Sequence, residues 1–516
     1  MRDGSSRSKS VKHHDTNSAS ATPEKFPSRH TNLYLACVLA SIAVFDTATV
    51  RQGHVWGDDF AMYVHHAENI VEGRPYADTG YIYNPAVPVY GPRMYPPVFP
   101  LLLAPLYKLF GLSLIPMKLE QVMFFLLALV AVYWFWRRDL GPDYALAMIA
   151  ILGFSPVFWA AKDMVLSDLP FLLLFYLAAA LVRSAPRESS GWWRWALLIG
   201  LVLYLAMGTR SAGIALPAGL LLYDLLSYRK ITKLTLVALA VCVAGVGLQT
   251  HLVGSGVGSY VGQQVHPTLR TLAVNLALYA RVLAGFWVAA TRNPFSFFVL
   301  ATIGLLTLAG LFSQYKHGLT IVEAFLAPYL GIVLLWPFAA GVRIVFPFIP
   351  WMVFLSLSGL RSLMARLAPH YSAAAVGTLV FVIAIPYTIA YRSTDFGPIR
   401  QDSGLADFNQ LCQAVRDDTS PHDVLIYFRA RALSLYTNRA GSTYNYHGTE
   451  QELWQYTRDI HATYLITTKA FHDDEGFLDR YVEKYSSSLE LTYENPHFRL
   501  YRIRSQTNAQ NLRTPH

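Results

Sequence analysis

The sequence predicts an α-helical protein that crosses a membrane many times and carries a small α/β domain near its C-terminus. Hydrophobic residues make up 53% of its 516 residues and charged residues only 15%, whereas an average soluble domain has about 25% charged residues. Long apolar runs recur between residues 32 and 391 and stop there. This composition excludes an ordinary soluble enzyme, and it excludes a disordered chain, which would be poor in apolar residues.

The two ends of the chain are predicted to be disordered. Residues 1–31 are polar and rich in Ser, Lys, Arg and His, and they lack the apolar segment and cleavage site of a signal peptide. We therefore expect a basic tail that stays in the cytoplasm. The net charge of +9 fits basic cytoplasmic loops and does not by itself indicate nucleic-acid binding. Residues 506–516 form the second predicted tail.

The apolar runs predict about eleven membrane-spanning helices, because most approach the length that a bilayer needs. The expected spans are 33–50, 117–136, 143–161, 169–183, 195–209, 212–226, 234–251, 295–313, 320–338, 344–360 and 373–391.

Basic residues predict the orientation of these spans. Every second loop carries Lys or Arg, and cytoplasmic loops hold such an excess. The N-terminus is then cytoplasmic, and an odd number of spans places the C-terminal region outside. The basic loops are marked by Arg137, Arg183, Arg229, Lys316 and Arg361.

Two outer segments are longer than the rest. In the first, residues 51–116, the stretch 59–72 has apolar residues at helical spacing, and the stretch 98–110 is apolar but short for a span. We expect the latter to lie in the membrane interface. The second segment, 252–294, is Gly-rich and then amphipathic, and it predicts another interfacial loop.

Residues 392–505 predict a soluble α/β domain of their own, because charged residues return and the apolar runs become short. A capping-box pattern at Thr449–Glu452 predicts one helix, and residues 474–485 predict another. Asn495-Pro496-His497 predicts a hairpin turn between the last two strands. The strand-like runs are 423–428, 432–437, 462–468, 489–494 and 498–503.

Acidic residues stand at the predicted outer ends of two spans. Asp58 and Asp59 follow the first span, and Asp163 and Asp168 lie in the second outer turn. A carboxylate partly buried beside a membrane and near a like charge can serve as a general base. The alternatives remain open: Gly-Asp-Asp is also ordinary turn chemistry, and Asp168 before Leu-Pro is also a good helix start.

Two arginines stand at outer ends, where the distribution of basic residues disfavours them. Arg210 ends one apolar run and Arg343 precedes another. The forked guanidinium group suits a phosphate, so both residues are candidates for binding an anionic group. Contact with lipid headgroups or an ion pair with the nearby acids explains them equally well.

No cofactor is predicted with certainty. The chain has no P-loop, no GxSxG and no HExxH motif. His54, His65 and His66 match no standard zinc spacing. A divalent cation bound through the carboxylates of Asp58 and Asp59 stays open.

Taken in order, these motifs resemble the GT-C superfamily of integral-membrane glycosyltransferases. The chain looks most like the bacterial relatives of protein O-mannosyltransferases and of the aminoarabinose transferase for lipid A. The resemblance covers about residues 30–390 and rests on Asp58-Asp59 followed by Ala67, Asn69 and Gly73, on Tyr95-Pro96-Pro97, on Ser167-Asp168-Leu169-Pro170, on Gly208-Thr209-Arg210, and on the RIVFPFIP segment that begins at Arg343.

The resemblance implies transfer of a sugar from a polyprenyl-phosphate carrier to an acceptor, with inversion, on the non-cytoplasmic face of a bacterial inner membrane. The acceptor is a cell-envelope glycan, lipid or protein. A transporter or flippase of a lipid-linked sugar is the alternative, although polar residues clustered at one face and the lack of a repeat favour an enzyme.

The resemblance also implies roles for individual residues. Asp58 is the expected base, and its neighbour Asp59 is the alternative because many relatives have Asp-Glu here. The residue chemistry then predicts two roles for Asp168, to stabilise the positive charge that develops on the sugar or to orient the acceptor, and it predicts that Arg210 and Arg343 bind the donor phosphate. Tyr95 and Asp163 are the expected substrate-binding residues. Tyr95 stands where the aminoarabinose branch has Lys, which argues against that donor.

Overall fold

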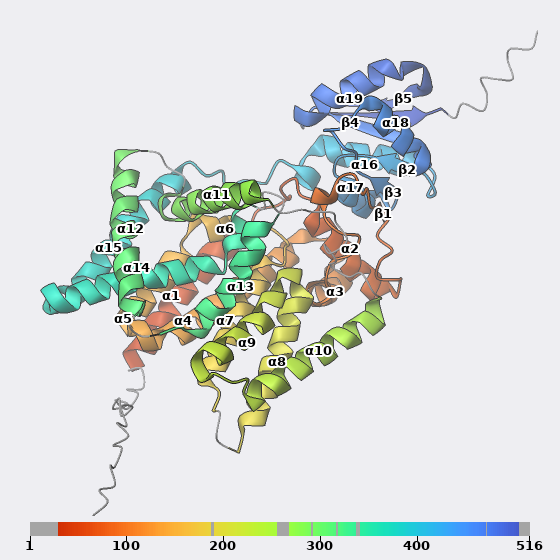
Figure 1. The fold of residues 1–516 in the computed structure, drawn as a ribbon. Coiled ribbons are helices and arrows are strands. Elements are labelled where there is room, and N and C mark those ends of the chain that lie inside the picture. The colour runs from red at the N-terminus through yellow and green to blue at the C-terminus, as the bar shows by residue number, and fades with distance from the viewer. Residues whose placement is uncertain are drawn as a thin grey trace, which may run out of the picture.

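The computed structural model describes residues 29–186, 190–254, 268–289, 293–315, 318–336, 341–470 and 472–504. Within these ranges the chain forms a helical body and a sheet domain at one end of it (Figure 1). Residues 1–28 of the predicted N-terminal tail and the whole of the predicted C-terminal tail lie outside the described residues.

Nine helices in the described ranges are long and apolar enough to cross a membrane. One of them, α9 (Ala215–Tyr228), reaches this length only together with the short turn η2 (Ser211–Ile214) that precedes it. Another, α15 (Ser372–Arg392), is long enough alone and continues the short turn η4 (Pro369–Tyr371). The others are α1 (Arg29–Ala48), α4 (Leu114–Leu140), α8 (Trp192–Thr209), α10 (Lys233–Val253), α11 (Leu269–Val288), α12 (Pro294–Tyr315) and α14 (Phe348–Leu367).

The predicted run 143–161 is a bent pair of helices. It forms α5 (Pro142–Gly153) and α6 (Pro156–Lys162), which meet at an angle of 56° and together would be a tenth span in the described part of the chain. Pro156 begins the second helix, and the Ser155 hydroxyl accepts a hydrogen bond from Val157 N–H at 3.2 Å. Proline and an N-cap serine together explain the break in the helix.

The polytopic helical fold is confirmed, but the count of eleven spans is not. Two predicted spans, α7 (Asp168–Ser184) and α13 (Ile321–Leu335), are helices of only 17 and 15 residues. The prediction of an interfacial loop over 252–294 missed α11, whose length and composition suit a membrane span. The polar residues of α11 favoured an interfacial loop over a span. One of them, Asn275, is buried, and its amide donates hydrogen bonds to the carbonyl oxygens of Leu334 and Trp336.

The first outer segment contains two helices at the predicted places. They are α2 (Asp59–Glu72) and α3 (Val98–Phe110), which pack against each other. Gly73 ends α2 in the left-handed conformation, with φ of 68°, and its N–H bonds the Asn69 carbonyl. Glycine adopts this conformation at no steric cost, so it stops the helix there.

The sheet domain has six strands in the order β1-β3-β2-β4-β6-β5. The first four are parallel, and β6 and β5 form an antiparallel hairpin at the far edge. Its strands are β1 (Tyr81–Ile82), β2 (Val424–Ile426), β3 (Ala440–Ser442), β4 (Tyr464–Thr468), β5 (Leu489–Glu494) and β6 (Phe498–Ile503), and its helices are α16 (Ala406–Asp418), α17 (Ala430–Thr437), α18 (Glu450–Asp459) and α19 (His472–Lys484).

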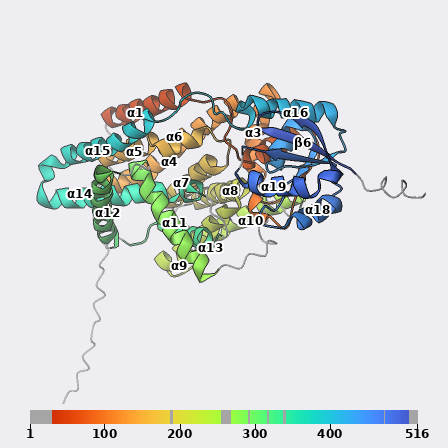
Figure 2. The same ribbon diagram turned by 90° about the horizontal axis from the view of Figure 1, so that it is seen from above.

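Helices cover both faces of this sheet (Figures 1 and 2). On β2, Leu425 packs in the cluster that contains α16, whereas the next residue, Ile426, packs in the cluster that contains α18 and α19. The same alternation holds on β4 for Ile466 and Leu465. Successive side chains of a strand point to opposite faces, so two apolar layers result.

Most strand predictions for this domain are confirmed, and one is wrong. The run 432–437 was predicted as a strand but belongs to helix α17. All but one of the eight residues of this helix are buried. Its sequence therefore lacks the alternation of apolar and polar residues with a helical period by which a helix with one exposed face is recognised. The Asn495 turn is confirmed: its side-chain oxygen accepts hydrogen bonds from His497 and Phe498 N–H.

Strand β1 comes from the first outer segment and pairs with β3. Gly441 N–H donates to the Gly80 carbonyl at 2.9 Å, and the Asn84 amide donates to the Thr443 carbonyl at the same distance. The segment after residue 392 therefore shares its sheet with the loop that follows α1.

Candidate active site

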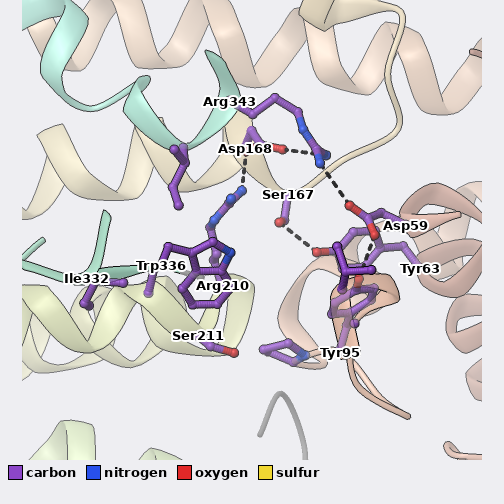
Figure 3. A pocket seen from close by; sticks show the side chains of 15 residues that line it. Asp59, Tyr63, Tyr95, Ser167, Asp168, Arg210, Ser211, Ile332, Trp336 and Arg343 are labelled. Carbon is purple, nitrogen blue, oxygen red and sulfur yellow. Dashed lines mark hydrogen bonds and ion pairs between the residues drawn. The ribbon is translucent and has the colours of Figure 1, made fainter. Parts of the chain in front are cut away.

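A cavity of about 200 Å³ lies where the ends of several helices meet. Figure 3 shows its polar side chains turned toward one another. They come from α2, from the segment before α3, from the start of α7, from the end of α8 and from the turn η3 (Val342–Val345) before α14. The lining residues that carry charge or a hydroxyl group are Asp59, Tyr63, Tyr95, Ser167, Asp168, Arg210, Ser211 and Arg343.

The helix order explains why residues distant in sequence meet here. Helices α7 and α8 are consecutive in the chain and pack together, so the start of α7 and the end of α8 lie on the same side. Asp168 is the first residue of α7, and Arg210 follows the last residue of α8. Their side chains form an ion pair.

Two carboxylates and two guanidinium groups alternate across the cavity. Arg343 bridges both acids: its Nη2 lies 3.1 Å from Asp59 Oδ2, and its Nη1 lies 3.7 Å from Asp168 Oδ2. Arg210 pairs with the other oxygen of Asp168. The side chain of Asp168 is only 5% exposed, whereas that of Asp59 is 36% exposed. Asp59 is therefore the more accessible acid.

The surroundings of Asp59 keep it ionised. Burial alone raises the pKa of Asp59, but the positive charges of Arg343 and Arg431 and a hydrogen bond from Tyr95 outweigh it and lower this pKa to about 2. Tyr95 Oη donates to Asp59 Oδ1 at 2.7 Å. The Tyr95 ring stacks on Tyr63, whose hydroxyl bonds Ser167 at 2.9 Å.

The sequence analysis missed Arg431, which reaches the site from the sheet domain. Arg431 is 2% exposed and lies at the start of α17. Its Nη1 donates to Tyr95 Oη at 3.1 Å and lies 3.6 Å from Asp59 Oδ1. Its Nη2 donates to the Pro92 carbonyl at 2.9 Å, and its guanidinium lies over the Tyr81 ring. The available signal was an arginine pair, Arg429 and Arg431, inside an apolar run.

Asp58, the predicted base, does not line the cavity. Its carboxylate is buried and faces the first turn of α17, where the N–H groups of Arg431 and Ala432 donate to it at 3.5 and 3.4 Å. A helix N-terminus favours such a negative charge. Burial raises the pKa of Asp58, against the opposing effect of Arg429, Arg431 and the two N–H groups.

Asp163, a predicted substrate-binding residue, also lies outside the lining of the cavity. Its side chain is 1% exposed, and Arg51 donates to it from both its backbone N–H and its Nε, at 3.0 and 2.8 Å. Lys162 Nζ donates to it at 3.0 Å. These contacts hold the segment that follows α1 against the end of α6. Asp163 therefore stabilises the fold.

The three histidines serve the packing of the first outer segment. His66 Nδ1 bonds the Tyr76 carbonyl at 2.8 Å, and its Nε2 accepts the Tyr95 N–H at 3.3 Å. Burial lowers the pKa of His66 to about 3, so the ring is neutral and fixes the backbone of Tyr95. His54 is also buried, with Nε2 accepting the Val165 N–H at 3.2 Å.

In the described ranges no group of three or more His, Cys, Asp or Glu side chains has the geometry of a metal site. In the cavity itself, the carboxylates of Asp59 and Asp168 face guanidinium groups. These residues do not form a donor set for a divalent cation, and no chemical step below is routed through one.

Comparisons with known proteins identify chains that are similar to this one in sequence or in fold. Residues 94–253 match the sequence model of the family described as dolichyl-phosphate-mannose-protein mannosyltransferase. The structure of ArnT from Cupriavidus metallidurans bound to undecaprenyl phosphate aligns over 91% of this chain and 98% of its own, with 13% identity and a TM-score of 0.55. The chain therefore has the same fold as ArnT.

Archaeal proteins share this fold. The Archaeoglobus fulgidus oligosaccharyltransferase in its apo form aligns over 93% of this chain and 76% of its own, with 13% identity and a TM-score of 0.56. The archaeal oligosaccharyltransferase AglB from the same organism, in complex with an inhibitory peptide and a dolichol-phosphate, aligns over 93% and 75%, with 12% identity and a TM-score of 0.54. A search of curated protein sequences found no match.

Proposed function

We propose that this protein is a membrane glycosyltransferase that moves a sugar from a polyprenyl-phosphate carrier to an acceptor. The observation that carries the proposal is the cavity in which two arginines face two carboxylates, Asp59 and Asp168. Transfer of a sugar from a lipid phosphate requires an anion site and a base within one small space. The GT-C fold, and the lipid phosphates bound to ArnT and AglB, support this reading.

Arg210 and Arg343 bind the donor phosphate in this proposal. Both guanidinium groups line the cavity, and each is now paired with a carboxylate. A phosphate also offers two oxygens that one guanidinium can bind in a bidentate pair, and it gains a second negative charge when it leaves the sugar. The apolar part of the lining, which includes Ile332 and Trp336, contacts the first carbons of the prenyl chain.

Asp59 is the proposed base. It lines the cavity and is the more exposed of the two acids there, whereas Asp58 is buried against α17. Geometry decides before pKa when a general base is assigned. Asp58, which the family resemblance favours and whose pKa is raised, is the alternative.

The reaction then balances as a single displacement. The acceptor hydroxyl oxygen forms a bond to the anomeric carbon while the bond from that carbon to the phosphate oxygen breaks, which inverts the configuration. Asp59 takes the hydroxyl proton, and polyprenyl phosphate leaves with the bonding electrons. Asp168 stabilises the positive charge of the oxocarbenium-like transition state, and Arg210 and Arg343 stabilise the departing phosphate.

The pKa of Asp59 changes in the useful direction as the donor binds. In the free protein Arg343 contributes to holding this pKa at about 2. When the phosphate draws Arg343 toward itself, one positive charge leaves Asp59 and the pKa rises. A base with a higher pKa removes the acceptor proton more readily.

The proposed location follows from the charge of the loops. The basic loops lie in the cytoplasm of a bacterium, the N-terminus lies with them, and the cavity and sheet domain face the opposite side of the inner membrane. The acceptor is a cell-envelope glycan, lipid or protein that reaches that side.

The test uses purified protein in nanodiscs, a panel of polyprenyl-phosphate sugars and crude envelope acceptor. Release of free polyprenyl phosphate is measured for the native protein, for Asp59→Asn and for Asp58→Asn. We expect release from one donor class and its loss in Asp59→Asn. Release that survives in Asp59→Asn and is lost in a stable Asp58→Asn would assign the base to Asp58. Absence of release from every donor, together with movement of a labelled donor across vesicle membranes, would support the flippase alternative.

A further inference from the structure

We propose that Arg431 of the sheet domain is a positioning residue for the base, so that the sheet domain completes the active site. The inference rests on the proposed function and assigns a task to a domain that carries no recognisable motif of its own. Arg431 does not line the cavity and its side chain is 1% exposed, so it acts through Asp59 and Tyr95 and does not touch substrate.

The two oxygens of Asp59 have different partners. Oδ1 accepts the Tyr95 hydroxyl at 2.7 Å and lies 3.6 Å from Arg431 Nη1. Oδ2 lies 3.1 Å from Arg343 Nη2 and faces the cavity side. The carboxylate is thus held at one oxygen from the sheet domain and at the other from the helical body.

Donor binding makes the contact from the sheet domain decisive. A phosphate in the cavity competes for Arg343, which frees Oδ2 of Asp59 to accept the acceptor proton. Oδ1 stays held by Tyr95 and Arg431, and the remaining positive charge of Arg431 keeps the carboxylate ionised and oriented. Without Arg431 the carboxylate has only the Tyr95 hydroxyl to fix it at that moment.

Arg431 is itself held in place from several sides. Its Nη2 donates to the Pro92 carbonyl at 2.9 Å, and its guanidinium carbon lies 4.5 Å from the centre of the Tyr81 ring. Asp58 accepts its backbone N–H and so fixes the start of α17. Gly91, with φ of 86°, makes room for it: an added Cβ would lie 2.8 Å from Tyr95 Oη and 3.1 Å from Arg431 Nη2.

The experiment compares Arg431→Met with a matched control, Arg439→Met, in the full-length protein. Arg439 belongs to the same domain and donates to the carbonyl oxygens of Thr419 and Arg416, but it takes no part in the cavity. The measured quantities are kcat, the KM for the donor, and the melting temperature. They are obtained from release of polyprenyl phosphate with the donor that the native protein uses.

We expect Arg431→Met to lower kcat by about 100-fold, the cost of misplacing a reacting group by roughly 1 Å. The donor KM should stay within about twofold, because Arg210 and Arg343 still bind the phosphate. Arg431→Lys should recover part of kcat, since it keeps the charge. Arg439→Met should lower the melting temperature and leave kcat near the native value.

Three outcomes would overturn the proposal or its basis. An unchanged kcat in Arg431→Met removes Arg431 from the mechanism. Parallel losses of kcat and melting temperature in both arginine variants would show a structural role only. Failure of the native protein on every donor would instead overturn the proposed function. Where Arg431→Met does not fold, Arg431→Gln carries the test, because it keeps a polar side chain at this position but removes the charge, and it should lower kcat and leave KM unchanged.

Discussion

At the scale of single residues, two adjacent carboxylates have opposite surroundings. Asp59 faces Arg343 in the cavity, and its pKa is lowered to about 2. Asp58 faces the N–H groups of α17, and its pKa is raised by burial. Although they are neighbours in the chain, Asp59 lines the cavity, whereas Asp58 joins the first outer segment to helix α17.

The first prediction separates these two roles. Asp59→Asn should lower turnover by at least about 100-fold, the low end of general-base catalysis, and should leave the melting temperature close to native. Asp58→Asn should lower the melting temperature, because the N–H groups of Arg431 and Ala432 then lose one of the two oxygens that accept their hydrogen bonds. Calorimetry and donor turnover on both variants check this, and a stable, inactive Asp58→Asn would reverse the assignment.

The second prediction concerns pH and Asp474 in the sheet domain. Asp474 is 1% exposed, accepts the Thr468 N–H at 3.2 Å and bonds the Tyr444 hydroxyl. Burial raises its pKa to about 8, although Thr468 N–H and Arg429 act in the opposite direction. The folded protein therefore holds this proton up to about pH 8, whereas the unfolded chain loses it near the ordinary aspartate pKa of 3.8. Stability should fall as pH rises between these values.

Asp474→Asn should remove this dependence and raise the melting temperature at neutral pH. Asp479→Asn is the control, because Asp479 lies on the same helix and is exposed. Melting temperatures of the native protein and both variants are compared between about pH 5 and pH 8, a range that lies between the pKa values of Asp474 in the unfolded and folded states. An equal slope for Asp474→Asn and the native protein would show that Asp474 is ionised in the folded state.

Most of the candidate site could be read from the sequence, residue by residue. Asp59, Asp168, Arg210 and Arg343, chosen as charged residues at the outer ends of apolar runs, line one cavity, and so does Tyr95, which the family resemblance indicated. Asp58 and Asp163 were predicted in the same way and do not line it. Arg431 could not be found in this way. Its proposed role depends on a contact with Tyr95, which lies 336 positions earlier in the chain. Local patterns carry no information about such a partner.

At the scale of helices, α12 and α14 pack closely through two glycines. A Cβ added at Gly310 would overlap the Leu355 carbonyl oxygen, and one added at Gly359 would overlap the Leu306 carbonyl oxygen. Small residues let membrane helices approach in this way. This contact supports α14, which follows the turn that carries Arg343.

The third prediction uses a matched pair of glycines on α12. Gly310→Ala should destabilise the protein by about 1–3 kcal/mol, the usual cost of overpacking. Gly304→Ala should be neutral or stabilising, because an added Cβ there meets no atom within 4 Å and alanine favours a helix. Thermal unfolding in one detergent compares the two, and equal melting temperatures would contradict the close contact.

Elements with a clear period were predictable, and buried or short ones were not. The 59–72 helix was found because its apolar residues recur at helical spacing. Helix α17 was taken for a strand because its residues are buried on almost every side. Strand β1 was missed because it has two residues, too few for any alternation to show.

At the scale of the whole molecule, the sheet domain is held by side chains from the loop after α1. Trp56 packs edge-on against Phe408 and Phe498, with ring centres 5.4 and 6.5 Å apart. The backbone N–H of Trp56 donates to the Gln401 side-chain oxygen at 3.0 Å. The loop thus inserts an aromatic ring into the core of the domain that it helps to build.

The fourth prediction is that Trp56→Ala loosens this docking. The chain between α15 and α16 should then be cut faster by a protease added to intact nanodiscs, because the domain separates more often from the helical body. Trp193→Ala serves as the control, since Trp193 lies on α8, is 47% exposed and takes no part in the sheet domain. Unchanged cleavage in Trp56→Ala would show that the other contacts suffice.

The pairing of β1 with β3 also has a consequence for biosynthesis. Ile82 and Ser442 are bonded to each other 360 positions apart in the chain. At a synthesis rate of roughly 5–20 residues per second, the early strand waits about 20–70 s for its neighbour. During that time every apolar helix enters the membrane, while Arg431 does not yet exist. Under the proposed role of Arg431, a chain that ends before residue 431 should therefore turn over a lipid-linked donor about 100-fold more slowly, and full activity should begin only after the sheet domain has folded.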